Sequence, residues 1–457
     1  MINQYPGSLH NHSCYSNLKF RDSINRVTDL IDYAIELGHS VIAFTEHDSV
    51  SNAIKIEQYY NEIKKEHPNF KVIRGNEIYL CRNGLNADNF IPGQDKYYHF
   101  ILLAKDAIGH QQIREISSRA WHRSYFARNQ RRIPTYYSDI EEIIGKNPGH
   151  VIASTACLGG CLATQLLRHR ENLNDEFYQQ IINWCLYMRS LFGEDYFYFE
   201  LQPAASPEQN YVNQEIIKLS NYLNIPYIVT TDSHYLKKED ASIHEAYLNS
   251  QDADREIKSF YATTYMMGTK ELESYILNSV ITKEDMNKAY ESIQHIADMC
   301  EDYSLKRELV IPALKWKIPE LKYIDSYWFE RIPNLEKFYN SDYEGDNILA
   351  RAIIQRIMER PEELDNAETY TAIADNLDKT WESSIVNKTH WSAYFLNLQQ
   401  IIEECWNAGT LVGPGRGSGV GFILLYILDI IQINPLRETT ETFSFRFLNP
   451  SRVSVLD

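Results

Sequence analysis

The sequence lacks the features that would place it in a membrane or in a disulfide-stabilised secreted class. Its 457 residues contain no apolar run long enough to cross a bilayer, since the best candidate, 422–433, is short and contains Asp429. No basic segment followed by an apolar one opens the chain, so no secretory signal is visible. The seven cysteines are an odd number and form no CxxC pair, which predicts reduced thiols in the cytoplasm.

Positive charge is also scarce. The chain has 45 Lys and Arg against 62 Asp and Glu, a net charge of -17, which argues against a surface that coats nucleic acid uniformly. It leaves open an enzyme acting on nucleic acid, because metal ions and local basic grooves can supply positive potential. Internal repeats and low-complexity tracts are absent, and the length predicts about two to four domains.

Two regions differ in their hydrophobic pattern. Up to about residue 280, short apolar runs alternate with amphipathic stretches such as 24–37, which ends at Gly38, a plausible helix cap. The predicted strands are 41–45, 72–74, 100–104, 151–154, 196–201 and 227–231. Repeated strand–helix units imply a parallel sheet, closed as a barrel or open. From 282 charged helical stretches such as 282–300 replace the strands, which predicts a domain boundary near 275–285.

Side chains that bind metals recur near the strand ends. His10 and His12 are two residues apart, so on a strand they point to the same face. The other candidates are His47, Glu77, His99, Cys157, Asp232 and His234, together with Asp22. In a parallel barrel the strand ends form one rim where active sites assemble. Each residue alone could be an ordinary core or loop residue, but the set is suited to two or three divalent Zn, Mn or Fe ions.

The stretches LHNHSCYSN, IAFTEHDS, GNEIYL, YYHFILLAK, STACLGG and VTTDSHYL resemble the PHP (polymerase and histidinol phosphatase) domain of bacterial DNA polymerase III alpha subunits. The resemblance implies a distorted (β/α)7 barrel, an α/β fold, with metal-dependent 3′–5′ exonuclease activity. It implies as metal ligands His10, His12, Asp22, His47, Glu77, His99, Cys157, Asp232 and His234. It implies a catalytic role for His10, His12, His47, Glu77, Asp232 and His234. Glu46 replaces the family's usual Asp and is expected to orient a ligand imidazole.

A glycine-rich stretch, LVGPGRGSGVGF, precedes an apolar segment near the end of the sequence. Its Gly415, Arg416, Gly417 and Ser418 would suit a triphosphate, although a simple turn before a buried helix explains the pattern equally well. With INPL and FRFLNPSRVSVLD it resembles the polymerase-beta-like palm of the same family. That resemblance implies contacts to a deoxynucleoside triphosphate and Mg, with Asp457 as the first catalytic aspartate. Lacking the other aspartates, this chain alone is expected not to extend a primer.

A basic cluster lies within the PHP-like region, between the stretches YYHFILLAK and STACLGG. It comprises Arg119, His122, Arg123, Arg128, Arg131 and Arg132, interleaved with Trp121, Tyr125 and Phe126. Basic and aromatic residues together can hold a single nucleic-acid strand by charge and stacking. The alternative is a solvated helix face and loop.

These patterns together predict a PHP domain over 1–280, a helical connecting region over 281–388 and a palm segment over 389–457. The predicted function is that of the N-terminal portion of a bacterial or phage C-family replicative DNA polymerase. Its expected partners are DNA, deoxynucleoside triphosphates, a C-terminal polymerase chain, a sliding clamp and other replisome proteins. The alternatives are a stand-alone PHP phosphoesterase acting on small phosphate monoesters and a non-catalytic scaffold.

Overall fold

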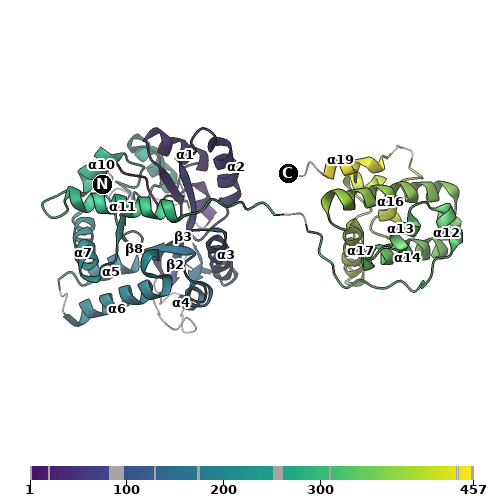
Figure 1. The fold of residues 1–457 in the computed structure, drawn as a ribbon, viewed down its shortest axis with the longest axis horizontal. Helices are drawn as coiled ribbons and strands as arrows, with labels where there is room; N and C mark the ends of the chain where they lie inside the picture. The colour runs from purple at the N-terminus through teal and green to yellow at the C-terminus, as the bar shows by residue number, and fades with distance from the viewer. Residues whose placement is uncertain are drawn as a thin grey trace. The chain divides into compact units, whose positions relative to one another are not determined.

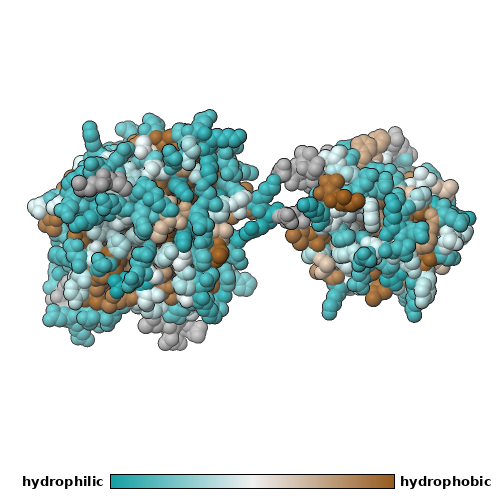
Figure 2. Space-filling model, in the orientation of Figure 1, coloured by the Kyte–Doolittle hydropathy of each residue, from teal (hydrophilic) through white to brown (hydrophobic). Residues whose placement is uncertain are grey.

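The computed structural model describes the chain except residues 1–2, 19–20, 82–96, 128–129, 172–174, 251–260, 308–309, 439, 441 and 454–457. The described residues form two compact units, 1–305 and 306–457, drawn in Figure 1. Hydrophilic residues cover most of the face of each unit that Figure 2 shows. No helix in the described part of the chain has the length and hydropathy needed to span a bilayer.

The first unit is built on a curled sheet whose strand order is β1-β2-β3-β7-β8-β9. The strands are β1 Val41–Phe44, β2 Lys71–Cys81, β3 Tyr97–Ala104, β7 Val151–Ser154, β8 Phe197–Leu201 and β9 Tyr227–Val229. Each predicted strand is therefore present. The prediction of a purely parallel sheet is wrong, because β3 pairs antiparallel with both β2 and β7. The fold is consequently a mixed α/β one, with helices packed around the curled sheet (Figure 1).

The N-terminal segment joins the two edges of this sheet. Ser8 and Asn11 accept backbone hydrogen bonds from Ala43 and Thr45 of the β1 edge. On its other side, the backbone N–H of His12 donates to Ser233 O, beyond β9, at 2.9 Å. The segment is thus an isolated bridge and not the strand that the sequence suggested. Because it is still extended, it places residues of both edges next to its two histidines.

Helices cover the outside of the sheet. Those of the first unit include α1 Val27–Glu36, α2 Ala53–Ile63, α3 Ala107–His122, α5 Cys161–Arg168, α6 Asp175–Phe192, α7 Pro207–Leu223, α8 Ala241–Asn249 and α10 Thr269–Ile276. The predicted cap after α1 is confirmed: Gly38 has φ +75° and its N–H donates to Ile35 O. A positive φ favours glycine, which has no side chain to clash with the backbone.

The first unit reaches further along the chain than the predicted boundary near 280. Helix α11 (Lys283–Met299) begins at a capping box formed by Thr282 and Asp285. Its apolar face, including Met286 and Ile293, is buried in the same core as the sheet. Burial of this face adds about 25 cal/mol of stabilisation per Å² of apolar surface, so the helix is part of the first unit and is not a connector.

The second unit is helical. Its helices are α12 Ser326–Arg331, α13 Leu335–Tyr339, α14 Glu344–Glu359, α15 Pro361–Leu364, α16 Ala367–Asn387, α17 Trp391–Asn407, α18 Ile423–Ile427 and α19 Pro450–Val453. Its described residues form no strand, so the palm resemblance stays a prediction for this region. Phe395 and Phe422 stack at 5.6 Å in its core. The apolar helix expected after the glycine-rich turn has only five residues, Ile423–Ile427.

His39, just before β1, makes the stability of the first unit depend on pH. Its Nε2 contacts Met267 O at 3.2 Å, and its ring meets Tyr5 edge-on. Burial lowers the pKa of His39 to about 4, against about 6.5 in an unfolded chain. The unfolded state therefore binds the proton first, and stability is lost as pH falls from about 6.5 to about 4, by about 3 kcal/mol in total. Urea unfolding measures the free energy of unfolding across this pH range, and we expect it to depend less on pH in His39→Gln than in the wild type. The control is His295→Gln, at an exposed position, which should follow the wild type. An equal pH dependence in all three proteins would contradict this account.

Candidate metal centre

The predicted ligands of the first unit lie together where the sheet edges meet. His10 and His12 come from the bridging segment, His47 follows β1, and Asp232 with His234 follows β9. Glu77 and His99 lie inside β2 and β3, which corrects their predicted positions at the ends of strands. The reversal of β3 explains why His99 still reaches the rim: the start of an antiparallel strand lies beside the ends of its neighbours.

The first group of side chains surrounds the two N-terminal histidines. Their Nε2 atoms are 3.1 Å apart, and Asp232 Oδ1 lies 3.1 Å from His10 Nε2 and 3.2 Å from His12 Nε2. The two carboxylate oxygens of Glu77 approach the same nitrogens at 3.5 and 3.4 Å. All four side chains are almost completely buried. Nitrogen and oxygen donors therefore converge on one small volume.

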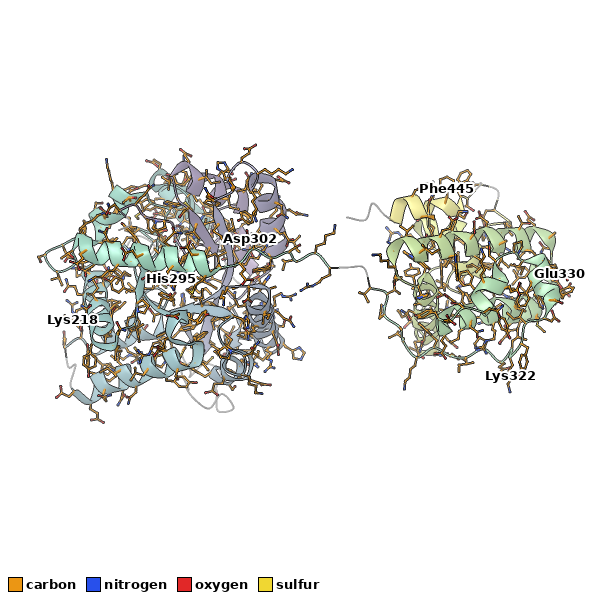
Figure 3. All side chains as sticks on the ribbon, viewed as in Figure 1. Lys218, His295, Asp302, Lys322, Glu330 and Phe445 are labelled. Carbon is orange, nitrogen blue, oxygen red and sulfur yellow. The ribbon has the colours of Figure 1, made fainter. Side chains whose placement is uncertain are left out.

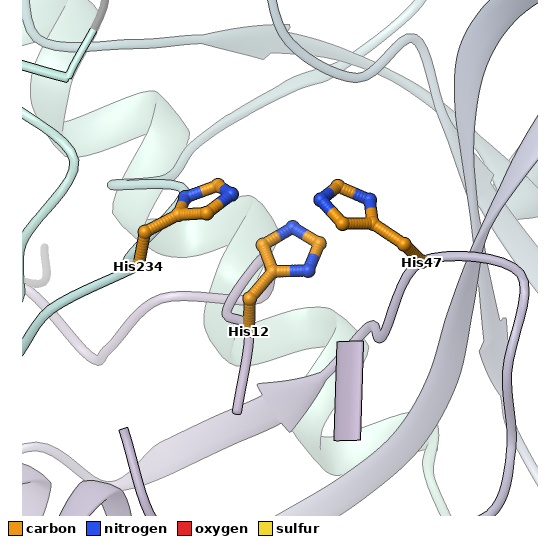
Figure 4. A group of neighbouring side chains, drawn as sticks. All are labelled: His12, His47 and His234. Atoms are coloured by element: carbon orange, nitrogen blue, oxygen red, sulfur yellow. The ribbon is translucent and has the colours of Figure 1, made fainter. Parts of the chain in front are cut away.

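A second group shares His12. The rings of His12, His47 and His234 face one another, as Figure 4 shows, with ring centroids 4.1 Å apart for His12 and His47 and 4.5 Å apart for His12 and His234. Asp22 Oδ2 contacts His47 Nε2 at 2.5 Å and His234 Nε2 at 3.1 Å. Asp22, which is distant in sequence from both partners, is thus close enough to share an ion with them.

A third group shares Glu77. Glu77 Oε1 lies 2.7 Å from His99 Nδ1, and Cys157 Sγ lies 3.4 Å from the same nitrogen. The side chain of His99 is 21% exposed, whereas that of Glu77 is 1% exposed. The structure therefore brings every predicted PHP ligand into one connected cluster, and His99 is its most accessible imidazole among those in ion-pair contacts.

Hydrogen bonds around the cluster orient the imidazoles. His10 Nδ1 contacts Glu200 Oε1 at 2.7 Å, and His12 Nδ1 contacts Ser16 Oγ at 3.0 Å. His234 Nδ1 contacts the carbonyl oxygen of Asp232 at 2.8 Å. If each Nδ1–H donates in these contacts, each Nε2 presents its lone pair to the cluster, which is the tautomer that a metal ligand needs.

Sequence reasoning missed Glu200 and Ser16. Glu200 is a charged residue in the buried strand β8, and that conflict with its apolar surroundings was a usable signal. Ser16 donates to Glu46 and accepts from the backbone N–H of His47. The orienting role expected of Glu46 therefore reaches His12 through Ser16.

The electrostatics of the cluster favour ionised carboxylates. Burial and the neighbouring His47 and His234 lower the pKa of His12 to about 3, so its ring stays neutral. Burial favours the neutral form of His47, but the carboxylates of Glu77 and Asp22 outweigh it and raise its pKa to about 10. Burial also opposes ionisation of Glu77, yet the neighbouring imidazoles hold its pKa well below its usual range. The ionised, buried carboxylates of the cluster therefore need positive charge close to them.

These residues fit divalent metal ions. Both oxygens of Glu77 and Oδ1 of Asp232 are buried without a hydrogen-bond partner of good geometry among the described residues. Buried carboxylate oxygens are normally satisfied, and a cation satisfies them without a donor hydrogen. The donor set combines imidazole nitrogens, carboxylate oxygens and the thiol of Cys157, a mixture typical of Zn, Mn or Fe sites.

The other predicted site residues lie elsewhere. Gly415 and Arg416 lie in a loop of the second unit, and Gly417 and Ser418 begin a short 3-10 helix, Gly417–Gly421. The φ angle is +145° at Gly415 and +76° at Gly417, and Arg416 and Ser418 are exposed. Their predicted role in phosphate binding stays a prediction. Asp457 and Arg128 fall outside the described residues.

Comparison with known proteins agrees with this geometry. Residues 8–204 match the PHP domain family, and 348–457 match the bacterial DNA polymerase III alpha NTPase domain. The chain is 33% identical over 451 residues to the DNA-directed DNA polymerase of Bacillus phage SPbeta, covering 94% of this chain and 34% of that protein. It is 27% identical over 483 residues to DNA polymerase III subunit alpha of Thermus aquaticus, covering 98% of this chain and 37% of that protein.

The first unit therefore carries the segment, residues 8–204, that matches the PHP domain family. The chain as a whole is similar to bacterial and phage DNA polymerases of the polymerase III alpha type. It spans about a third of the length of these relatives, 34% and 37%.

Proposed function

We propose that this chain is the N-terminal portion of a C-family replicative DNA polymerase and that its PHP centre removes nucleotides from the 3′ end of DNA. The observation that carries the proposal is the convergence of all the predicted PHP ligands on one buried cluster, supported by oriented imidazoles. We further propose that the cluster holds two or three divalent ions, Zn, Mn or Fe.

Divalent ions bound in such a cluster activate water and stabilise the negative charge that develops on a phosphoryl group. Glu77 belongs to two of the ligand groups and His12 to two, so these residues would be shared between neighbouring groups when ions are bound. A cavity of about 40 Å³ beside Asp232, lined also by Thr231, Thr263 and Thr264, offers one approach to the cluster. The partly exposed His99 marks another.

In the complete polymerase, we propose that Gly415, Arg416, Gly417 and Ser418 contact the phosphates of a deoxynucleoside triphosphate. Mg ions would serve the palm, beginning at Asp457. DNA, a C-terminal polymerase region, a sliding clamp and other replisome proteins are the partners proposed for this cytoplasmic assembly. The match of residues 348–457 to the polymerase III alpha NTPase domain supports this part of the proposal.

The exonuclease is tested with the full chain, reconstituted with Mn²⁺ or Zn²⁺, and a 5′-labelled single strand of DNA. We expect a ladder of products shortened from the 3′ end. Asp232→Asn should abolish it, because a neutral amide cannot replace the carboxylate oxygen between His10 and His12. The matched control is Asp298→Asn, an exposed position on α11. Phosphate release from small monoesters, with the DNA left intact, would favour the stand-alone phosphoesterase instead.

A further inference from the structure

A small hairpin in the first unit carries aromatic side chains on one strand and basic side chains on the other. It consists of β4 (Tyr125–Ala127) and β5 (Gln130–Arg132). The guanidinium of Arg131 lies 4.4 Å from the ring centroid of Phe126 and 5.8 Å from that of Trp121. Phe126 is 69% exposed, so this row of three side chains, Trp121, Arg131 and Phe126, is open to solvent at its Phe126 end. Surface cation–π contacts of this kind attract the guanidinium to the ring faces and so favour this arrangement of the side chains.

The arginines of this hairpin differ from the other arginines of the predicted basic cluster in their ion pairing. Arg119 pairs with Glu115 and Glu142 at 2.8 Å, and Arg123 pairs with the buried carboxylate of Asp139. These arginines therefore stabilise the fold locally. Among the residues that the structure describes, no carboxylate lies within ion-pair distance of Arg131 or Arg132. In a chain of net charge -17, the hairpin keeps cationic groups available for an anionic ligand.

The hairpin is attached directly to the segments that bear metal ligands. The hydroxyls of Tyr125 and Tyr97 are hydrogen-bonded, and Tyr97 precedes His99 by two residues on β3. Successive residues of a strand alternate between its faces, so Tyr97 and His99 lie on the same face. Trp121 Nε1–H donates to the carbonyl oxygen of Asp48, the residue after His47, at 2.6 Å. The hairpin and Trp121 are therefore connected to the segments that carry His99 and His47, and His99 is the most accessible of the cluster's imidazoles in ion-pair contacts.

We propose that the β4–β5 hairpin binds single-stranded DNA and guides its 3′ end past His99 to the metal cluster. The inference rests on the proposed function for the identity of the reaction, but the binding itself needs no hydrolysis. Phe126 would stack on a base, while Arg131 and Arg132 would contact backbone phosphates. An aromatic side chain and two cations in one short hairpin match a single strand, whose bases are unpaired and whose phosphates are evenly spaced.

The test measures fluorescence anisotropy of a labelled oligothymidylate with the full chain in EDTA, so that no hydrolysis occurs. For Phe126→Ser combined with Arg131→Gln we expect Kd to rise about tenfold, the effect of losing one base-stacking platform. For Arg131→Gln with Arg132→Gln we expect the slope of log K against log salt to fall by about 1.4, at roughly 0.7 per phosphate contact. Both pairs are on the surface and leave the core intact.

Arg170→Gln is the matched control, because Arg170 lies 4.8 Å from the ring centroid of Tyr211 in a similar surface contact away from the hairpin. This variant should bind the oligonucleotide as the wild type does. Wild-type affinity and salt slope in both hairpin variants, or an equal loss in Arg170→Gln, would overturn the proposal. If the hairpin variants lose binding but the wild type never degrades DNA, the hairpin proposal stands and the exonuclease proposal fails.

Discussion

Replacement of both His10 and His12 by alanine should remove most of the bound metal and reduce exonuclease activity by more than about 100-fold. Loss of an outer partner of a ligand costs about 10–100-fold in metal affinity, and removal of two ligands should cost more. The two Nε2 atoms lie 3.1 Å apart between Glu77 and Asp232, so no described side chain of the cluster can replace both donors. Elemental analysis after gel filtration measures the metal retained per chain.

The control for this experiment is the double variant His67→Ala with His295→Ala. It also removes two imidazoles from the first unit, and His295 projects from the exposed side of α11 (Figure 3). It should retain the metal content and activity of the wild type. Near-stoichiometric metal in the His10 and His12 variant, with the fold intact by circular dichroism, would contradict a shared site.

Glu200→Gln is expected to weaken metal binding by about 10–100-fold while leaving every direct ligand in place. Glu200 Oε1 lies 2.7 Å from His10 Nδ1 and accepts a hydrogen bond from Thr230 Oγ1 at 2.6 Å. An amide keeps the size of the side chain but removes the negative charge that favours donation from Nδ1–H. His10 would then populate the tautomer that turns its lone pair away from the cluster.

Glu215→Gln provides the matched control, since Glu215 is also buried but pairs with Lys218 on α7, at 2.6 Å. Competition of each variant with a chromogenic chelator gives the metal affinity, and thermal unfolding of the metal-free proteins reports on general destabilisation. We expect Glu200→Gln to change the affinity much more than the unfolding temperature, and Glu215→Gln to leave the affinity unchanged. A metal affinity equal to that of the wild type in Glu200→Gln would show that His10 does not depend on this carboxylate.

The local pattern of residues was sufficient to locate most of the fold. Each predicted strand is present, and α11 (Lys283–Met299) lies within the predicted helical stretch 282–300, because short apolar runs, helical periodicity and caps act within a few residues. The candidate ligands could also be predicted, since they follow or flank those strands and their motifs resemble the PHP domain. The identity of the chemical groups at the site was thus contained in the sequence.

Which groups meet was decided only by the tertiary structure. His10 and Glu200 are 190 positions apart, and no periodicity connects them. The reversal of β3 places His99 at the rim, and the packing of α11 against the sheet extends the first unit to Leu305. Likewise, Arg123 and Arg131 are both arginines of the same basic cluster in the sequence, but in the structure Asp139 pairs with Arg123 and not with Arg131. Local propensities act between neighbours along the chain, whereas strand direction, burial and ion pairing depend on contacts between distant residues that form only when the whole unit folds.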